Sequence, residues 1–232
     1  MALGALSGPR LAPLSGKATH LVVLCHGYGA DGNDLIGLAP HWQALLPGAA
    51  FVAPHAPQPC PGAGYQWFPI SRIDPHEMHR GVVGAAGVLQ AFIDLELARL
   101  ALSPDRLALV GFSQGTMMAL HVGLNGAVAP AAIVGFSGLL TGPKPQPKGA
   151  PPILLGHGDA DPLIPPEALF FTTGAVGAAG LCVQWNLAPG LGHGIDAGEI
   201  AIAGHFLSLA FGGRLKIGGD ACCALAVANP TQ

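Results

Sequence analysis

One serine of the sequence, with a glycine two positions away on each side, has the context of a nucleophile. Ser113 lies in the pentapeptide Gly111-Phe-Ser-Gln-Gly115, between an apolar run of strand length and a run of helical character. At such a sharp strand-to-helix turn the serine hydroxyl is pushed out above the sheet edge, and the flanking positions must lack side chains. The N-terminus of the following helix favours the negative charge that develops when a carbonyl is attacked. The segment predicts a nucleophilic serine, with an incidental serine in a glycine-rich turn as the alternative.

A serine hydroxyl needs a base to take its proton, and the base needs a carboxylate to orient it. Asp159 and Asp161 follow the apolar run 153–156, and His193 stands between two glycines after the run 182–187. The carboxyl ends of parallel strands share one edge of a sheet, so these side chains can meet the serine in space. The chain order Ser, Asp, His is that of the α/β-hydrolases. Either aspartate can serve, although Asp159 is better placed to satisfy the N–H groups of its own turn.

The elements that must position these residues follow from the hydrophobic pattern. Apolar runs of strand length alternate with longer helical patterns, which is typical of βαβ units and a parallel sheet. The expected strands are 21–25, 51–53, 107–110, 131–136, 153–156 and 182–187. The expected helices are 34–46, 81–102, 114–124, 166–179 and 196–211. We therefore predict an α/β fold with a mostly parallel central sheet, helices on both faces and no separate lid domain.

Length and composition narrow the classes of protein. The chain has 232 residues, a formal net charge of -3 and 50% apolar residues, so it should fold and has no positive field to attract nucleic acid. We expect one domain over residues 1–212 and a tail over residues 213–232 that shows no hydrophobic period. The cysteines lack metal-site spacing and are expected to be free thiols, including the adjacent Cys222 and Cys223 of the tail.

Two long stretches raise the question of a membrane. Residues 107–143 and 168–195 contain no Lys, Arg, Asp or Glu. Glycines, prolines and polar residues interrupt both, so neither is expected to form a spanning helix or any stable membrane insertion. Residues 1–24 lack the charged start and unbroken apolar segment of a secretory signal. A cytoplasmic location is therefore expected.

Several motifs in order resemble those of the phospholipase/carboxylesterase group of α/β-hydrolases, which also holds the acyl-protein thioesterases. They are His26-Gly-Tyr-Gly-Ala-Asp-Gly32, Pro54-His-Ala-Pro57, Trp67-Phe68, Gly111-Phe-Ser-Gln-Gly115, Gly158-Asp-Ala-Asp-Pro-Leu-Ile-Pro165 and Gly192-His-Gly194. The resemblance reaches from the first expected strand to the last expected helix. It implies that Ser113 is the nucleophile, Asp161 the orienting acid and His193 the general base.

The expected function is that of a serine carboxylesterase acting on a small-molecule ester. The N–H of Gln114, directly after the serine, is expected to bind the oxyanion, and the resemblance adds the N–H of Tyr28. Short- to medium-chain carboxylic esters, or thioesters or lysophospholipids, would react through an acyl-enzyme intermediate and without a cofactor. The expected acyl cleft is open and apolar. Its expected lining residues, besides Tyr28, are Trp67, Phe68, Leu163 and Leu191. The oligomeric state is left open.

Three rival interpretations remain. Residues 27–32 also fit the dinucleotide fingerprint G-x-G-x-x-G of an NAD-binding oxidoreductase, but no acid ends the next strand to hold a ribose. His76-Glu-Met-His79 looks like a pair of metal ligands, but it is one residue short of H-E-x-x-H. The third rival is a catalytically inactive hydrolase fold that serves only to bind a ligand.

Overall fold

The computed structural model describes residues 6–72, 74–126 and 129–215. A sheet of seven strands forms the middle of this part of the chain, in the order β1-β3-β2-β6-β7-β8-β9. The strands are β1 (Arg10–Leu11), β2 (His20–Cys25), β3 (Ala49–Val52), β6 (Leu107–Phe112), β7 (Ala132–Phe136), β8 (Ile153–Gly158) and β9 (Val183–Ala188). Only β1 runs antiparallel to its neighbour. The predicted α/β fold with a mostly parallel sheet is confirmed.

The strand order reverses direction beside β2. The chain leaves β2 for β3 on one side and returns to β6 on the other, with Cys25 at the end of β2 paired to Gly111 near the end of β6. Ligands in open α/β sheets bind outside the carboxyl ends of the strands at such a switch point. The turn after β6, which carries the predicted nucleophile, therefore lies where the topology favours a site.

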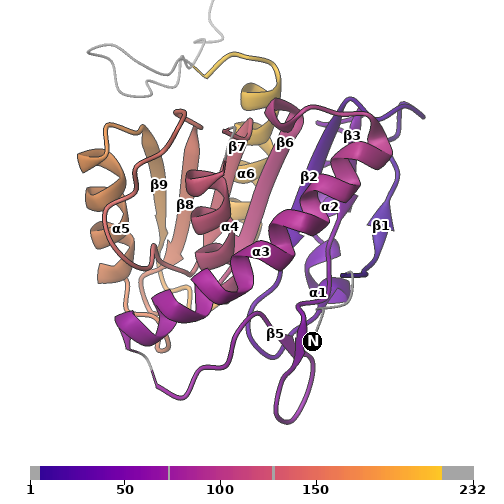
Figure 1. The fold of residues 1–232 in the computed structure, drawn as a ribbon. Coiled ribbons are helices and arrows are strands. Elements are labelled where there is room, and N and C mark those ends of the chain that lie inside the picture. Colours follow the sequence, from indigo (N-terminus) through magenta and orange to yellow (C-terminus); the bar gives the residue numbers. More distant parts are fainter. Residues whose placement is uncertain (1–5, 73, 127–128, 216–232) are drawn as a thin grey trace, which may run out of the picture.

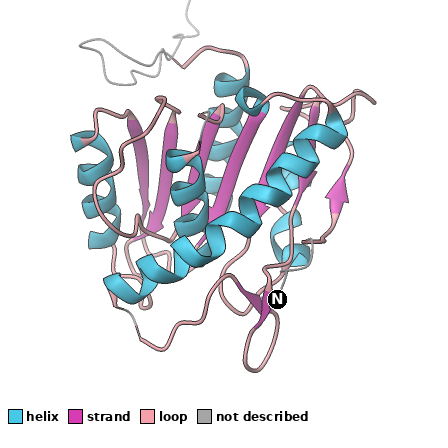
Figure 2. Ribbon diagram, viewed as in Figure 1, coloured by secondary structure: helices cyan, strands magenta, loops and turns pink. Residues whose placement is uncertain are grey.

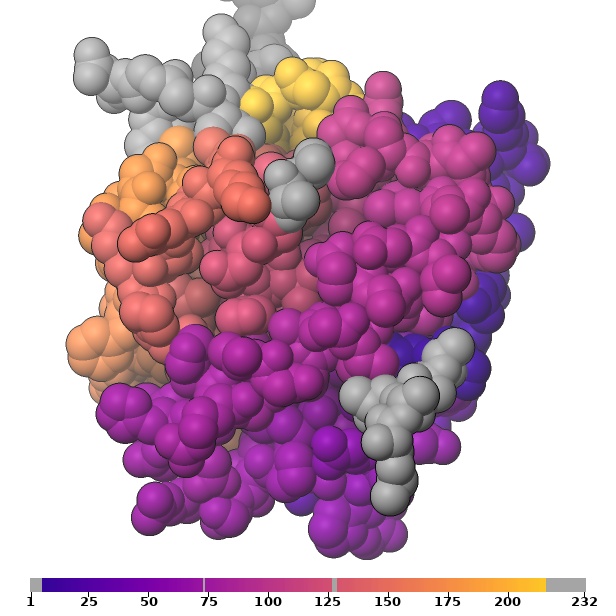
Figure 3. Space-filling view, in the orientation of Figure 1, coloured from indigo at the N-terminus to yellow at the C-terminus, as the bar shows by residue number. Residues whose placement is uncertain are grey.

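Helices cover both faces of the sheet (Figures 1 and 2). On the front face as drawn lie α3 (Pro75–Leu100), α4 (Gln114–Asn125) and α5 (Glu167–Ala178). On the opposite face, α1 (Gly32–Ile36), α2 (Ala39–Trp42) and α6 (Ala197–Phe211) pack on a second apolar cluster. The space-filling view shows α3 and the segments around it closing over the front of the sheet (Figure 3). The described residues contain no separate lid domain.

The predicted helices differ from the observed ones at two places. The helix expected over 34–46 is two short helices, α1 and α2, separated by Gly37 and Leu38. The helix α3 begins six residues before the predicted start, because the Asp74 carboxylate accepts a hydrogen bond from the Glu77 amide and Pro75 occupies the first position. This earlier start carries Pro75 and Met78 to the carboxyl edge of the sheet.

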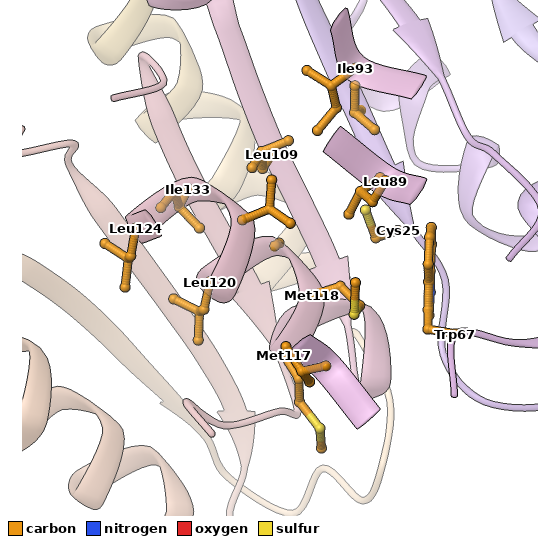
Figure 4. Close-up of a cluster of buried hydrophobic side chains, with 14 of the residues drawn as sticks. Cys25, Trp67, Leu89, Ile93, Leu109, Met117, Met118, Leu120, Leu124 and Ile133 are labelled. Atoms are coloured by element: carbon orange, nitrogen blue, oxygen red, sulfur yellow. The ribbon is translucent and has the colours of Figure 1, made fainter. Parts of the chain in front are cut away.

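The larger apolar cluster lies between the sheet and the front helices (Figure 4). Leu89 and Ile93 of α3 face Leu109 of β6, and the buried Trp67 lies beside Cys25. By length and composition α3 is the one helix among the described residues that is apolar enough to cross a membrane. Its apolar stripe is instead part of this core, where Leu89 and Ile93 are almost fully buried.

A small hairpin that the sequence did not predict joins two loops at the carboxyl edge. It consists of β4 (Gln58–Pro59) and β5 (Tyr65–Gln66). The amide of Gly29 donates to the Tyr65 carbonyl at 2.9 Å, and the amide of Tyr65 donates to the Ala30 carbonyl at 2.8 Å. These bonds fix the loop after β2, which includes Tyr28.

Most of the predicted tail lies outside the described residues. These are residues 216–232, which include Cys222 and Cys223. The division into a domain and a tail therefore stays a prediction. Cys25, Cys60 and Cys182 are buried, and Cys25 and Cys60 form no disulfide.

A carboxylate is buried between α6 and the sheet. Glu199 is 2% exposed, and neither of its carboxyl oxygens has a hydrogen-bond partner among the described residues. Residue 156 of β8 is glycine and leaves room for this carboxyl, because a Cβ there would overlap Glu199 Oε1 in its present position. Burial, assisted by the nearby Asp196 charge, raises the pKa of Glu199 from 4.5 to about 7, and the nearby Asp196 amide offsets this only in part.

This burial predicts a loss of stability as the pH rises. Between pH 4.5 and 7 the folded chain holds a proton on Glu199 that the unfolded chain has released, so the free energy of unfolding falls over this range. Glu199→Gln should remove a drop on the order of 1 to 3 kcal/mol. Urea unfolding of both proteins at pH 5 and pH 8 measures it, with the exposed Asp94→Asn as the matched control. An equal drop in parent and Glu199→Gln would contradict the assignment.

Candidate active site

Ser113 occupies the turn between β6 and α4 in a strained backbone conformation. Its φ is 55° and its ψ is -116°, in a region that L-residues rarely adopt. Its amide donates to the Phe136 carbonyl of the neighbouring strand at 2.9 Å. The side chain of Thr116, one turn into α4, both donates to that carbonyl at 2.8 Å and accepts from the Phe136 amide at 3.0 Å. The turn is thus anchored to β7 on one side.

The glycines around this serine are required by close backbone approach. A Cβ on Gly115 would overlap the Cys25 carbonyl oxygen, and a Cβ on Gly111 would overlap the backbone of Gly115. On the other side of the serine, a Cβ on Gly27 would lie 3.3 Å from the Ser113 Cβ. The three positions together let the ends of β2, β6 and α4 meet around the serine.

Asp161 and His193 are brought together from two different loops at the carboxyl edge. His193 Nδ1 lies 2.7 Å from Asp161 Oδ2 and donates a hydrogen bond to it. The other carboxyl oxygen, Oδ1, accepts from the amides of Leu163 at 2.8 Å and Ile164 at 3.0 Å. Burial opposes ionisation of Asp161, but the bonds from His193 and from the two amides outweigh it and lower its pKa below 3.8. The carboxylate is therefore ionised at neutral pH.

Asp159, the alternative orienting acid, has a different partner. Its Oδ1 accepts from the Gly190 amide at 2.6 Å and so closes the loop between β9 and α6. A second bond fixes the same loop on the far side of His193, because the buried Ser137 hydroxyl donates to the Gly194 carbonyl at 3.1 Å. Asp196 then caps α6 by accepting from the Glu199 amide at 2.7 Å. The histidine loop is thus held at three points, and Ser137 is a contribution that no sequence signal indicated.

Ser113 and His193 face the same cavity, which has a volume of about 590 Å³. No hydrogen bond joins the serine hydroxyl to the imidazole within the part of the chain that the structure describes. Such bonds are often long in free enzymes and tighten when substrate binds. Most of the cavity wall is apolar. Its apolar residues include Ile70, Met78, Met117, Leu139, Ile164 and Phe171.

Tyr28 and Gln114, the predicted oxyanion donors, both line this cavity. The Gln114 amide is the first N–H of α4, and the first amides of a helix have no acceptor within it. Its side chain has a role that the sequence did not reveal: Oε1 accepts from the Trp67 amide at 2.8 Å and Nε2 donates to the Phe68 carbonyl at 2.8 Å. The Tyr28 loop is held by His26, which donates from Nδ1 to the Gly27 carbonyl and accepts the Ala56 amide at Nε2.

The structure places the residues predicted for the acyl cleft in different surroundings. Leu163 lines the cavity, whereas Trp67, Phe68 and Leu191 are not among its lining residues. Trp67 and Phe68 are buried in the core, and the Trp67 indole N–H donates inward to the His26 carbonyl at 2.9 Å. Aromatic residues occur in cores as well as in clefts. Here the acceptor of the Trp67 indole N–H lies inside the molecule, which favours a core position for the pair. The residue after them that reaches the cavity is Ile70.

Comparison with known proteins agrees with this arrangement. The family model for phospholipases and carboxylesterases matches residues 8–211. The chain belongs to the phospholipase/carboxylesterase family. Acyl-protein thioesterase 1 of Neurospora crassa is 28% identical over 222 residues, which cover 86% of this chain and 90% of that protein. Membership in this family indicates a hydrolase of the esterase class.

Solved structures of family members share the α/β-hydrolase fold described here. A crystal structure of esterase PE8 is 40% identical, with a TM-score of 0.84, over 88% of this chain and 98% of that one. A carboxylesterase from Bacillus cereus, 17% identical, has a TM-score of 0.75 over 89% of this chain and 95% of that one, and shows the fold alone. The recognition of the family from its motifs is confirmed.

Two of the rival interpretations rest on short motifs, the dinucleotide fingerprint and the histidine pair of residues 76 and 79, and the structure shows where both lie. The segment of the dinucleotide fingerprint leads into α1, a helix of only five residues. His76 is exposed on the first turn of α3, while His79 turns inward, with its ring 6.2 Å from that of His121 on α4. The described residues contain no group of three or more His, Cys, Asp or Glu side chains arranged to hold a metal ion.

The glycine at position 115 gives a direct test of the serine turn. Gly115→Ala should lower the free energy of unfolding by several kcal/mol or prevent folding, because the methyl group would overlap the Cys25 carbonyl. The matched control is Gly87→Ala on the exposed side of α3, where no atom lies within 4 Å. This control should raise stability by about 0.5 to 1 kcal/mol. Equal unfolding midpoints for the two variants in urea would contradict the packing described.

Proposed function

We propose that the protein is a serine carboxylesterase that hydrolyses short- to medium-chain carboxylic esters through an acyl-enzyme intermediate. The observation that carries the proposal is the hydrogen bond from His193 Nδ1 to the ionised Asp161, at a cavity that Ser113 also lines. Because Nδ1 carries the shared proton, Nε2 of His193 is left free to accept another. This arrangement supplies an oriented base beside a nucleophile.

In the acylation step, Ser113 Oγ forms a bond to the ester carbonyl carbon while its proton passes to His193 Nε2. The positive charge that forms on the imidazole is stabilised by the Asp161 carboxylate. The tetrahedral intermediate collapses as the C–O bond to the alcohol breaks and His193 returns the proton to the departing oxygen. A water molecule then repeats the sequence on the acyl-enzyme and releases the carboxylic acid.

The oxyanion of both intermediates is assigned to the amides of Gln114 and Tyr28. Both residues line the cavity beside Ser113, and both backbone segments are held in place, by the Gln114 side chain bonds and by the His26 imidazole. Preorganised donors of this kind are worth on the order of 100-fold to 1000-fold in rate each. The side chain at position 28 does not alter the donor itself.

The acyl chain is assigned to the apolar part of the cavity. Met78, Met117 and Leu139 form its wall together with Phe171, which is 77% exposed and so stands at the open side. Side chains of this kind accept hydrocarbon and offer little to a charged acyl group. Thioesters form a second substrate class, because they use the same catalytic groups and a family relative is named as an acyl-protein thioesterase.

Two other functions fit the residues less well. A nicotinamide oxidoreductase would leave the Asp161–His193 pair without a role, and family membership does not support it. An inactive binding protein would have no use for the strain at Ser113 or for the ionised Asp161.

The cytoplasmic location and the absence of membrane insertion stay predictions.

A substrate profile tests the proposal. p-Nitrophenyl esters with acyl chains from acetyl to hexadecanoyl, and the matching thioesters, should be hydrolysed with kcat/KM highest at short to medium lengths. Ser113→Ala and His193→Ala should each lower kcat by at least about 1000-fold, and Asp161→Asn by on the order of 1000-fold to 10000-fold. Asp159→Asn, in the same loop region but bonded to Gly190, is the matched carboxylate control and should keep most of the activity.

Two outcomes would count against the proposal. Turnover by Ser113→Ala close to that of the parent would overturn the mechanism. A rate that rises steadily beyond dodecanoyl chains would overturn the assignment to short and medium acyl groups.

A further inference from the structure

His157 is a second histidine in contact with the Asp161 carboxylate. It is near the end of β8, and its side chain is fully buried, as is that of Asp161. Its Nε2 lies 2.9 Å from the Ile164 carbonyl oxygen and 3.3 Å from Asp161 Oδ2. Nothing in the local sequence pattern shows which groups the ring meets.

The two neighbours of Nε2 determine where the ring carries its proton. A carbonyl oxygen and an ionised carboxylate are both acceptors, so Nε2 must be the donor. Nδ1 is buried and has no hydrogen-bond partner among the described residues. A second proton on Nδ1 would be an unpaired buried donor, which is costly. The ring therefore serves as a hydrogen-bond donor through Nε2.

Three hydrogen bonds and one longer contact surround the Asp161 carboxylate. Oδ1 accepts from the amides of Leu163 and Ile164, and Oδ2 accepts from His193 at 2.7 Å and is also approached by His157 at 3.3 Å. Each donor takes up part of the negative charge that otherwise acts on the His193 proton alone.

We propose that His157 is a positioning residue for the reaction, which it serves by donating its Nε2 proton to the Ile164 carbonyl while the same N–H group lies 3.3 Å from Asp161 Oδ2. The proposal rests on the proposed function. One bond holds the turn 161–164, and with it the cavity wall at Ile164, against β8. The 3.3 Å contact with Asp161 limits how Oδ2 can rotate and how strongly it attracts the proton on His193. The ring reaches the substrate only through these groups and takes no proton from it.

The kinetic test compares His157→Phe with His157→Gln. His157→Phe keeps the volume of a ring but removes the donor, and should lower kcat by roughly 10-fold to 100-fold. With one donor fewer, Asp161 holds the His193 proton more tightly, so the acid limb of the kcat/KM profile should move to higher pH. His157→Gln has a side-chain amide that offers a donor near the Nε2 position. It should restore kcat to within about 5-fold of the parent value and move the acid limb of the kcat/KM profile back to the pH of the parent.

A spectroscopic measurement accompanies the kinetics. The downfield proton resonance of the His193–Asp161 hydrogen bond should shift in His157→Phe and return in His157→Gln. Trp42→Phe is the matched control, because it removes another buried ring donor, the indole N–H that donates to the Ile200 carbonyl at 2.8 Å on the opposite face of the sheet. It should lower stability without moving the pH profile or the resonance.

The outcomes separate this proposal from the proposed function. If Ser113→Ala and His193→Ala abolish hydrolysis while His157→Phe keeps the parent pH profile and resonance, the positioning role is wrong and the serine mechanism stands. If His157→Phe does not fold, an unchanged profile and resonance in His157→Asn, which cannot place a donor at Nε2, contradicts the role in the same way. If Ser113→Ala stays active, the proposed function itself fails.

Discussion

The close approach of three backbone segments at one point of the sheet is the constraint on which the rest of the structure depends. The Cys25 carbonyl at the end of β2 leaves no room for a side chain at Gly115, and Gly111 in turn meets the backbone of Gly115. These contacts bring the first turn of α4 against the sheet and force Ser113 to a positive φ. The strain is tolerated because the Phe136 strand binds both the Ser113 amide and Thr116. The serine and the first helical amide therefore have fixed positions.

The partners of the serine are positioned by a different principle. Asp161 and His193 sit in loops that are held by hydrogen bonds. Three donors converge on the Asp161 carboxylate, and the His193 loop is tied by Asp159 and Ser137. Polar networks of this kind specify one arrangement when every member is satisfied. The parallel register of β7, β8 and β9 brings both loops to the edge where β6 ends.

The features that could be predicted from the sequence are those that depend on residues close together in the chain. Continuous apolar runs identified the long parallel strands, and the glycines around Ser113 identified the serine turn, because each depends on residues adjacent in the chain. The start of α3 was missed because its cap at Asp74 precedes the apolar stripe. Trp67 was placed in the cleft because aromatic character does not tell which side a ring faces. The contacts of three buried residues, Ser137, His157 and Glu199, form only when the chain has folded. The partner of Ser137, for example, is 57 residues away in the sequence, and no residue spacing indicates such a contact.

Covalent labelling with a fluorophosphonate tests the central claim most directly, since it reports which atom is the activated nucleophile. Intact-protein mass spectrometry should show one adduct per chain, and peptide mapping should locate it on Ser113. Labelling should be slowed strongly in His193→Ala and be absent in Ser113→Ala. An adduct on another residue, or an unlabelled protein that still hydrolyses esters, would contradict the account.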